Sequence, residues 1–274
     1  MKRLLLSCCI LLCAVSTLKA QEQPLISPDD SIRSLVGRLF PNSNPNLSAH
    51  MNLQFSTSGV ANFIEGDLED ASFKLNRVVF DLGGVLINLD FDNCLNAFRK
   101  AGFQDIEKQV CQFKGKGFFS LFELGEISPE EFRSAIRKEA SESLTDRKID
   151  DMWNLMLLDI PREKLDLLLE LREHYMVYLL SNTNRIHWEY ACEQMFSYRG
   201  FRVNDFFEDT FLSFEMHKAK PEKNIYEQMM KEANILPEET FFIDDSEANC
   251  QAAMSLGIQS HHYHIGENLS SLFE

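Results

Sequence analysis

The sequence is short of positive charge. Against 42 aspartates and glutamates it has 27 lysines and arginines, which gives a formal net charge of −15 at pH 7 over 274 residues. A surface of this sign repels a nucleic acid backbone, so we expect no nucleic acid partner. A small anion such as a phosphate ester could still bind, provided that a cation or a group of hydrogen-bond donors offsets the charge.

Cysteines are few beyond the N-terminal region, and they follow no metal-binding pattern. Three of the seven precede Ala14, and the other four are widely spaced: Cys94, Cys111, Cys192 and Cys250. None of these four belongs to a C-x-x-C pair. We therefore predict buried free thiols, of the kind found in cytosolic domains, rather than a disulfide framework.

The sequence also lacks an apolar run long enough to span a bilayer as a helix, so we expect no stable membrane span. The run Leu4–Val15 follows Lys2 and Arg3 and precedes small residues near Ala20. This is the pattern of a secretory signal peptide, which we predict over residues 1–20. Such a signal predicts a periplasmic location, whereas a fused or mis-assigned leader would leave the protein in the cytoplasm.

Residues 21–77 are predicted to be a leader of uncertain order with β-type alternation. Apolar and polar residues alternate from Leu47 to Phe55 and again from Ala71 to Leu75, the period of two that is typical of strands. In style, residues 34–77 resemble the start of an outer-membrane porin. The alternative is a poorly ordered leader with one or two isolated β segments.

From Val78 onward the pattern changes to short apolar runs separated by helical patterning. The runs cover residues 78–80, 176–180, 210–213, 240–243 and 258–262. Strands that are apolar on both faces and alternate with helices predict a parallel sheet covered on both sides. The expected fold class is α/β, a Rossmann-like doubly wound parallel sheet, and we expect residues 78–90 and 176–274 to form this core.

Residues 91–175 separate the first two predicted strands and are too many for a loop. We predict that they form an inserted α-helical cap subdomain over the sheet. Pro129 and Pro161 lie near the starts of two of its helices, where a missing N–H group costs nothing. The predicted helices are Asp92–Ala101, Asp105–Lys114, Pro129–Glu142, Lys148–Leu157 and Arg162–His174.

Reactive side chains follow four of the predicted strands. The carboxyl ends of parallel strands meet at one edge of a sheet, where open α/β sheets bind ligands. We therefore expect these side chains to converge, although each of them alone has an ordinary explanation as a cap or turn residue. In chain order they are Asp81, Ser181 with Asn182, Lys220, and the pair Asp244 and Asp245.

The order acid, hydroxyl, lysine, acid pair resembles the haloacid dehalogenase superfamily, and the resemblance covers residues 78–274. The runs FDLGG, LSNTNR, GEIS and KP are similar to those of bacterial glucose-1-phosphate phosphatases and of the phosphatase half of bifunctional epoxide hydrolases. The resemblance implies a Mg²⁺-dependent phosphatase that hydrolyses a small phosphomonoester, such as a sugar phosphate, through an aspartyl-phosphate intermediate.

The resemblance also implies the catalytic and substrate-binding roles. Asp81 would attack phosphorus as the nucleophile. Ser181 and the backbone N–H of Asn182 would hold phosphate oxygens, and Lys220 would neutralise the transferring group. Glu123 and Arg133, in the predicted cap, could also contact the substrate.

The implied Mg²⁺ ligands are Asp81, the carbonyl oxygen of Gly83 and Asp245, with Asp244 behind them. Gly83 is also a departure, because most phosphatases of the superfamily have a second aspartate there as general acid. Losing that acid could cost on the order of 10²–10⁴ in rate. The alternative is therefore a catalytically weak or inactive phosphate-binding protein.

Two considerations favour the phosphatase. The resembled sugar-phosphatase branch also has glycine at the position of Gly83, and a sugar phosphate with a good leaving group needs less protonation. Dehalogenase chemistry is disfavoured, because it needs no metal and would not need the pair of Asp244 and Asp245. The sequence sets neither the substrate nor the oligomeric state.

Overall fold

The computed structural model describes residues 54–55, 61–62, 75–106, 117–140 and 143–273. The chain divides into two compact units, Met1–Ser72 and Phe73–Glu274. In the first unit the described part is an antiparallel pair of strands, β1 (Gln54–Phe55) and β2 (Ala61–Asn62). The predicted signal peptide at 1–20 and most of the porin-like stretch 34–77 lie outside the described residues.

The second unit is built on a five-stranded parallel sheet in the order β5-β4-β3-β6-β7. The chain enters at the central strand, builds outward to one edge and then continues on the other side. This is the doubly wound arrangement that the sequence predicted. The strands are β3 (Arg77–Phe80), β4 (Met176–Ser181), β5 (Asp209–Leu212), β6 (Thr240–Asp244) and β7 (Gln259–His262).

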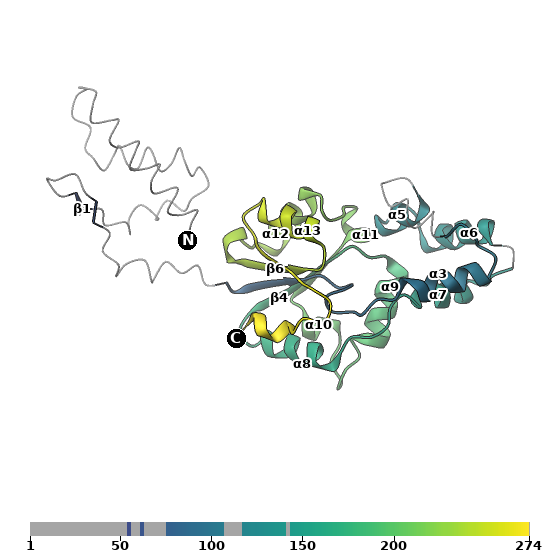
Figure 1. Ribbon diagram of the computed structural model, residues 1–274, viewed down its shortest axis with the longest axis horizontal. Coiled ribbons are helices and arrows are strands. Elements are labelled where there is room, and N and C mark those ends of the chain that lie inside the picture. The colour runs from purple at the N-terminus through teal and green to yellow at the C-terminus, as the bar shows by residue number, and fades with distance from the viewer. Residues whose placement is uncertain (1–53, 56–60, 63–74, 107–116, 141–142, 274) are drawn as a thin grey trace, which may run out of the picture. The chain divides into compact units, whose positions relative to one another are not determined.

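Helices cover both faces of the sheet (Figure 1). Helices α12 (Lys223–Ala233) and α13 (Glu247–Met254) lie on one face, and α8 (Arg162–Leu171) and α10 (Val203–Phe206) lie on the other. The remaining short elements are α9 (Arg185–Tyr190), the π-helix η3 (Ala191–Met195), α11 (Ser213–Met216), and the 3-10 helices η4 (Pro237–Glu239) and η5 (Leu269–Leu272).

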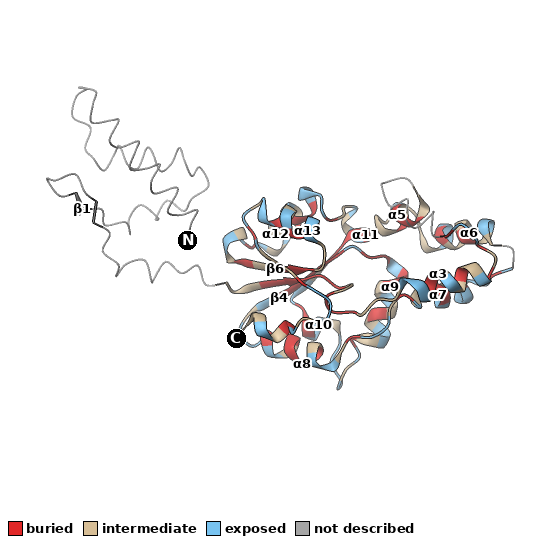
Figure 2. Cartoon of the chain, in the orientation of Figure 1, coloured by how far each residue is buried: buried red, intermediate tan, exposed pale blue. Residues whose placement is uncertain are grey.

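Successive residues of β3 face opposite helical layers. Val78 and Phe80 pack in one hydrophobic cluster with Leu168 of α8, whereas Val79 packs in another with Ile225 of α12. Figure 2 shows the central strands buried along their length. Because both faces of the strand are covered, every position needs an apolar side chain, which explains the unbroken run before Asp81.

The helical insert has a hydrophobic core of its own, centred on aromatic side chains. Trp153 packs there with Phe98, Phe119 and Phe132, at ring-centroid distances of 5.2–6.4 Å. The insert comprises α3 (Phe91–Lys100), α5 (Phe118–Glu123), α6 (Pro129–Glu139) and α7 (Asp146–Asn154). The predicted helix Asp105–Lys114 falls mostly outside the described residues.

Two linkers that run antiparallel to each other connect the insert to the sheet. The backbone N–H of Leu158 donates to the carbonyl of Asn88 at 2.9 Å, and that of Asp90 donates to Met156 at 2.8 Å. Leu89 and Leu157 form an antiparallel bridge between these bonds. The backbone pairing fixes where the insert leaves the sheet, next to the turn that follows β3.

The boundaries predicted for the insert and the core differ from the observed ones. The predicted cap ended at Tyr175 and included Arg162–His174, but α8 packs its leucines against β3 and β4. The compact unit begins at Phe73 rather than Val78, and Asn76 already accepts a backbone hydrogen bond from Met176 at 2.9 Å. Helical periodicity shows that a face is apolar, but it does not show which layer covers that face.

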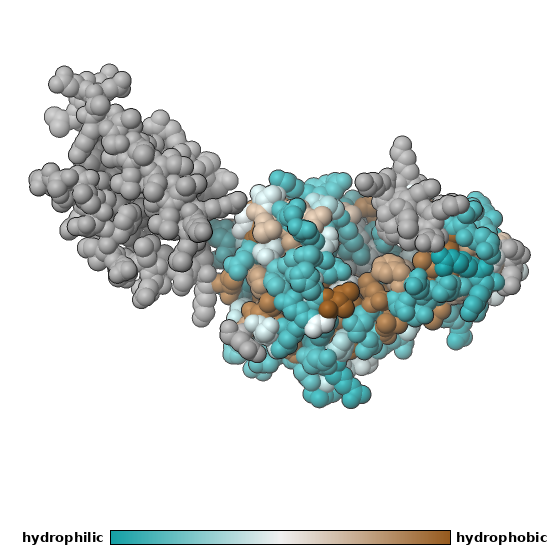
Figure 3. All heavy atoms as spheres, viewed as in Figure 1, coloured by the Kyte–Doolittle hydropathy of each residue, from teal (hydrophilic) through white to brown (hydrophobic). Residues whose placement is uncertain are grey.

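The surface and the thiols agree with the composition. None of the helices described is long and apolar enough to cross a bilayer. The face seen in Figure 3 is largely hydrophilic, with apolar side chains in small groups. Cys94 and Cys250 are buried free thiols, as predicted. Cys192 is also free but only partly buried, and Cys111 lies outside the described part.

The division after Ser72 leads to a prediction. The sheet, both helical layers and the insert are built from later residues, so a chain of residues 73–274 should fold without the first unit. We expect its melting temperature to lie within about 2 °C of that of residues 21–274, by circular dichroism. A chain starting at Val78 should melt lower, because it loses the hydrogen bonds of Asn76 and the ion pair between Arg77 and Glu239. An unfolded 73–274 chain would contradict this division.

Candidate active site

Three carboxylates and one ammonium group meet at the carboxyl edge of the sheet. The Nζ atom of Lys220 lies 2.7 Å from Oδ1 of Asp81 and 2.7 Å from Oδ2 of Asp244. It also donates to the carbonyl oxygen of Leu180 at 2.8 Å. Ligand-type oxygens of Asp81, Asp244 and Asp245 lie within 4.8 Å of one another. The neighbouring strands β3 and β6 end side by side, which brings the aspartates together.

Three of the four charged groups in this cluster are almost entirely removed from water. Asp81 is 7% exposed, Lys220 5% and Asp244 0%. Burial raises the pKa of Asp81, and nearby Asp244 raises it further, although the Lys220 ammonium opposes both. For Lys220, burial alone would lower the pKa, but the two carboxylates outweigh it and raise the pKa above its usual value. The lysine therefore stays charged, and the cluster favours additional positive charge.

Asp244 has no oxygen left without a donor. Its Oδ1 accepts from the backbone N–H of Ser246 at 2.8 Å and from Nδ2 of Asn249 at 2.9 Å, while Oδ2 accepts from Lys220. These bonds hold Asp244 as a support for the lysine rather than as a freely available ligand. Asn249 was not among the residues predicted from the sequence, where its only signal is its place in the first turn of the helix after the acid pair.

Asp245 is partly exposed, and its carboxylate lies over the backbone of Gly84. A Cβ atom on Gly84 would lie 2.2 Å from Oδ2 of Asp245, and the residue has a φ of +80°. Glycine is therefore required here both for its conformation and for the close approach. A ring nitrogen of His262 lies 2.9 Å from the Asp245 carbonyl oxygen, so the backbone of this aspartate is supported as well. Burial, then Asp244, raise the pKa of the Asp245 carboxyl.

The segment after β4 is bound to the backbone that carries the lysine. Asn182 accepts from the backbone N–H of Lys220 at 2.8 Å and donates to its carbonyl oxygen at 2.9 Å. The backbone N–H of Thr183 donates to Ser213 Oγ at 2.9 Å. Ser181 is 1% exposed at the end of β4. Segment 181–183 and Lys220 therefore form one supported unit beside Asp81.

The insert reaches this segment through the end of α5. The hydroxyl of Ser213 lies 2.7 Å from the carbonyl oxygen of Glu123, and a ring nitrogen of His217 lies 2.9 Å from that of Leu124. Gly125 has a φ of +67°, and a Cβ atom there would lie 2.0 Å from the carbonyl oxygen of Phe214. Only glycine fits so close an approach. The end of α5 therefore rests against the core beside segment 181–183.

The ionisation of Glu123 is strongly affected by burial at the end of α5. Burial raises the pKa of its carboxyl to about 7. Arg133, also in the insert, instead forms a bidentate pair with Asp150, with both bonds at 2.8 Å. Arg133 is thereby occupied within the insert, whereas Glu123 lies close to the core.

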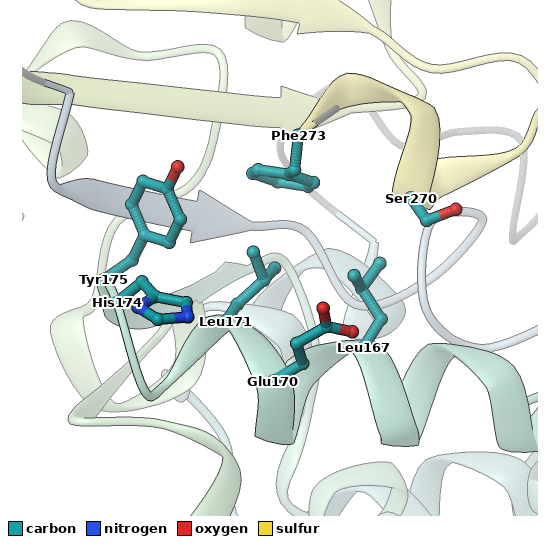
Figure 4. A pocket seen from close by; sticks show the side chains of 7 residues that line it. All are labelled: Leu167, Glu170, Leu171, His174, Tyr175, Ser270 and Phe273. Atoms are coloured by element: carbon teal, nitrogen blue, oxygen red, sulfur yellow. The ribbon is translucent and has the colours of Figure 1, made fainter.

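A cavity of about 370 Å³ lies elsewhere and contains none of the predicted site residues (Figure 4). It opens between α8 and the C-terminal 3-10 helix, and the ring of Phe273 faces into it. The lining residues are Leu167, Glu170, Leu171, His174, Tyr175, Ser270 and Phe273. The charged cluster at the carboxyl edge remains the candidate active site, because it alone gathers the residues predicted to be reactive.

The predicted residues thus fall into three positions. Four make the charged cluster, and two belong to the segment attached to the lysine. Gly83 lies in the turn after β3, where a Cβ atom would come within 3.0 Å of Cδ1 of Leu89. The charged cluster contains Asp81, Lys220, Asp244 and Asp245. The segment attached to the lysine contains Ser181 and Asn182, and the turn contains Gly83.

Comparison with known proteins identifies the family. Residues 75–257 match the model of the haloacid dehalogenase-like hydrolases, and the chain belongs to this family. It is 33% identical over 186 residues to the D-ribitol-5-phosphate phosphatase of Bacteroides thetaiotaomicron, covering 68% of this chain and 90% of that enzyme. The protein is therefore a hydrolase of the class that the sequence motifs indicated.

Solved structures of the family support the same assignment. A family enzyme of Bacteroides thetaiotaomicron, crystallised with magnesium and inorganic phosphate, is 51% identical with a TM-score of 0.70, over 73% of this chain and 100% of that chain. A predicted family hydrolase of Porphyromonas gingivalis is 35% identical with a TM-score of 0.67, over 73% and 96% of the two chains.

The buried charges predict how the loss of Lys220 depends on pH. In Lys220→Met, Asp81 and Asp244 lose their cation, so we expect a loss of about 3–5 kcal/mol in the free energy of unfolding at neutral pH. The pKa of Asp81 is raised in the folded state, so its protonated form stabilises the fold at low pH, and this contribution is lost as the pH rises through the folded pKa.

Removing the ammonium should raise that pKa further, so the deficit should shrink at about pH 5. Urea unfolding of the wild-type and Lys220→Met proteins at pH 7 and at about pH 5, in the presence of a chelator, measures this difference in the free energy of unfolding. A deficit independent of pH would mean that packing, and not charge, is what the lysine contributes.

Proposed function

We propose that this protein is a Mg²⁺-dependent phosphatase that hydrolyses a small phosphomonoester, with Asp81 as the nucleophile. The observation that carries the proposal is the contact of Lys220 with both Asp81 and Asp244 at the carboxyl edge, with Asp245 beside them. The relatives add support, since one is a named phosphatase and another was crystallised with magnesium and inorganic phosphate.

The charge and the chemistry of the cluster fit a hard divalent cation. Three carboxylates face one ammonium group, so a charge of about −2 remains when all are ionised, and every available ligand is an oxygen atom. Asp81, Asp245 and the carbonyl of Gly83 would hold Mg²⁺, with Asp244 behind them supporting Lys220. When bound, Mg²⁺ would supply the positive charge that lets an anionic nucleophile approach an anionic phosphate.

The reaction that these residues would perform has two steps. A carboxylate oxygen of Asp81 attacks phosphorus, the bond to the ester oxygen breaks, and the departing alkoxide takes a proton from water, because Gly83 offers no acid. Water then attacks the phosphorus of the aspartyl phosphate, the bond to Asp81 breaks, and inorganic phosphate is released. Ser181 and the N–H of Asn182 would hold the phosphate oxygens, and the Lys220 ammonium would offset their charge.

A sugar or sugar-alcohol phosphate is the substrate class that we favour. The curated relative is named for D-ribitol 5-phosphate, and the insert contacts Ser213 beside segment 181–183. An insert that acts as a cap over the site favours a small ester over a large one. Glu123, at the end of α5, is the insert residue that we place against the hydroxyl groups of the substrate. The inactive phosphate-binding alternative rests on Gly83 alone, and the named activity of the relative does not favour it.

The compartment is proposed from the sequence alone. Residues 1–20 have the pattern of an export signal, so we propose a periplasmic phosphatase. A fused or mis-assigned leader would instead leave the enzyme in the cytoplasm, which the free thiols of the hydrolase unit favour.

The nucleophile is tested by Asp81→Asn. The amide is nearly isosteric with the carboxylate but cannot form the acyl phosphate, so phosphate release should fall below about a hundredth of the wild-type rate. The assay is release of inorganic phosphate from a panel of sugar and sugar-alcohol phosphates. Asp209→Asn, an exposed change at the amino end of β5, is the matched control and should keep full activity. Retained activity in Asp81→Asn would exclude covalent catalysis there.

The two adjacent aspartates should differ in their effects on metal binding and on folding. Asp245→Ala should weaken Mg²⁺ binding more than Asp244→Ala, because Asp244 already has a donor on each oxygen. Asp244→Ala should lower the melting temperature more, since it leaves Lys220 half unpaired in the core. The rise in melting temperature with Mg²⁺ concentration measures the affinity without turnover. The reverse order of affinities would exchange the two roles.

A further inference from the structure

Three buried residues form a closed hydrogen-bonded group where the insert meets the core. Trp153 belongs to α7 of the insert, while Asn184 and His187 lie at the start of α9. The indole Nε1–H of Trp153 donates to Oδ1 of Asn184 at 3.3 Å, and the backbone N–H of His187 donates to the same oxygen at 3.1 Å. The rings of Trp153 and His187 are stacked, with centroids 4.7 Å apart and planes at 14°.

The donors in this group fix the orientation of every member. An indole N–H can only donate, so the atom of Asn184 that faces Trp153 must be its oxygen. The amide nitrogen of Asn184 therefore faces Nδ1 of His187 at 3.1 Å, and Nδ1 must accept. The ring proton of His187 then lies on Nε2, which donates to the carbonyl oxygen of Trp153 at 3.1 Å. Burial lowers the pKa of His187 to about 4, in agreement with a neutral ring.

A purely structural role would be to cap α9 and fill the core, and Asn184 is indeed the N-cap of that helix. The position of the group points further. Asn184 is the fourth residue of segment 181–184, in which Asn182 is bonded to the backbone of Lys220 and Thr183 to Ser213. Three successive residues of this segment are therefore anchored, and the anchor at Asn184 leads into the aromatic core of the insert.

We propose that His187 and Asn184 are positioning residues. They hold the phosphate-binding segment 181–184 in place and connect it to the helical insert through Trp153. The inference rests on the proposed function, because it assigns phosphate binding to Ser181 and Asn182. Phosphate donors must lie within a few tenths of an ångström of their places to bind well. If Asn184 loses its hydrogen bonds, segment 181–184 can shift, and phosphate binding weakens although Asn184 itself does not contact the phosphate.

The test compares two substitutions of His187 in the full chain. His187→Phe keeps the ring and its stacking on Trp153 but removes both ring hydrogen bonds. His187→Asn places an oxygen near the position of Nδ1, so it can again accept from Asn184. His174→Phe, at an exposed turn after α8, is the matched control. The readouts are the Kd for inorganic phosphate with Mg²⁺, by calorimetry, and KM and kcat for the best ester.

We expect His187→Phe to raise the Kd for inorganic phosphate and the KM by about tenfold, as for a lost buried hydrogen bond, with a smaller change in kcat. His187→Asn should recover most of the affinity, and the control should match wild type. A His187→Phe protein that melts lower but binds phosphate as wild type does would reduce the residue to a structural role and overturn the proposal.

A second variant keeps the test decisive if His187→Phe does not fold. Trp153→Phe retains an aromatic ring and the backbone carbonyl that accepts from His187, and it loses the indole N–H together with part of the ring volume. We expect a smaller rise in the phosphate Kd, and an unchanged Kd would again overturn the proposal. A wild-type protein that binds inorganic phosphate but hydrolyses no ester would refute the proposed function, while the comparison of variants would still decide this inference. A wild-type protein that does not bind inorganic phosphate at all would refute both the proposed function and this inference.

Discussion

The ammonium of Lys220, buried between Asp81 and Asp244, is the interaction on which the rest of the site depends. A buried lysine is costly unless it is paired, and two buried carboxylates this close repel each other unless a cation lies between them. Each charge is therefore tolerated only because the others are present. The cluster joins the ends of β3 and β6 to the turn before α12, so the same contact that prepares the chemistry also joins three parts of the fold.

The polar groups around this cluster hold its charged side chains in place through hydrogen bonds. Asn249 and the backbone of Ser246 complete the hydrogen bonds of Asp244, while Asn182 holds the backbone of Lys220 on both sides. Gly84 leaves space for the carboxylate of Asp245. Such fully bonded buried networks keep side chains in one arrangement, which is the condition for catalysis by preformed electrostatics.

The helical insert is attached to this network rather than only to the sheet. Its linkers pair beside the turn after β3, α5 meets Ser213, and Trp153 meets Asn184. The insert is thus bonded to the segment proposed to hold phosphate, and the binding of a substrate's non-reacting part can affect the geometry at phosphorus. In the proposed function, specificity and positioning would share the same few residues.

The sequence by itself determined the parallel sheet, the order of the reactive residues and the family, because apolar strands and strand-end motifs are local patterns. The sequence also determined that Gly83 stands where an acid is common. Only the tertiary structure decided that α8 belongs to the core, that the hydrolase unit begins at Phe73, and that Asn249, Gly84 and the Trp153, Asn184 and His187 group support the site. These depend on contacts between residues far apart in the chain, and periodicity carries no information about which distant surface a side chain will meet.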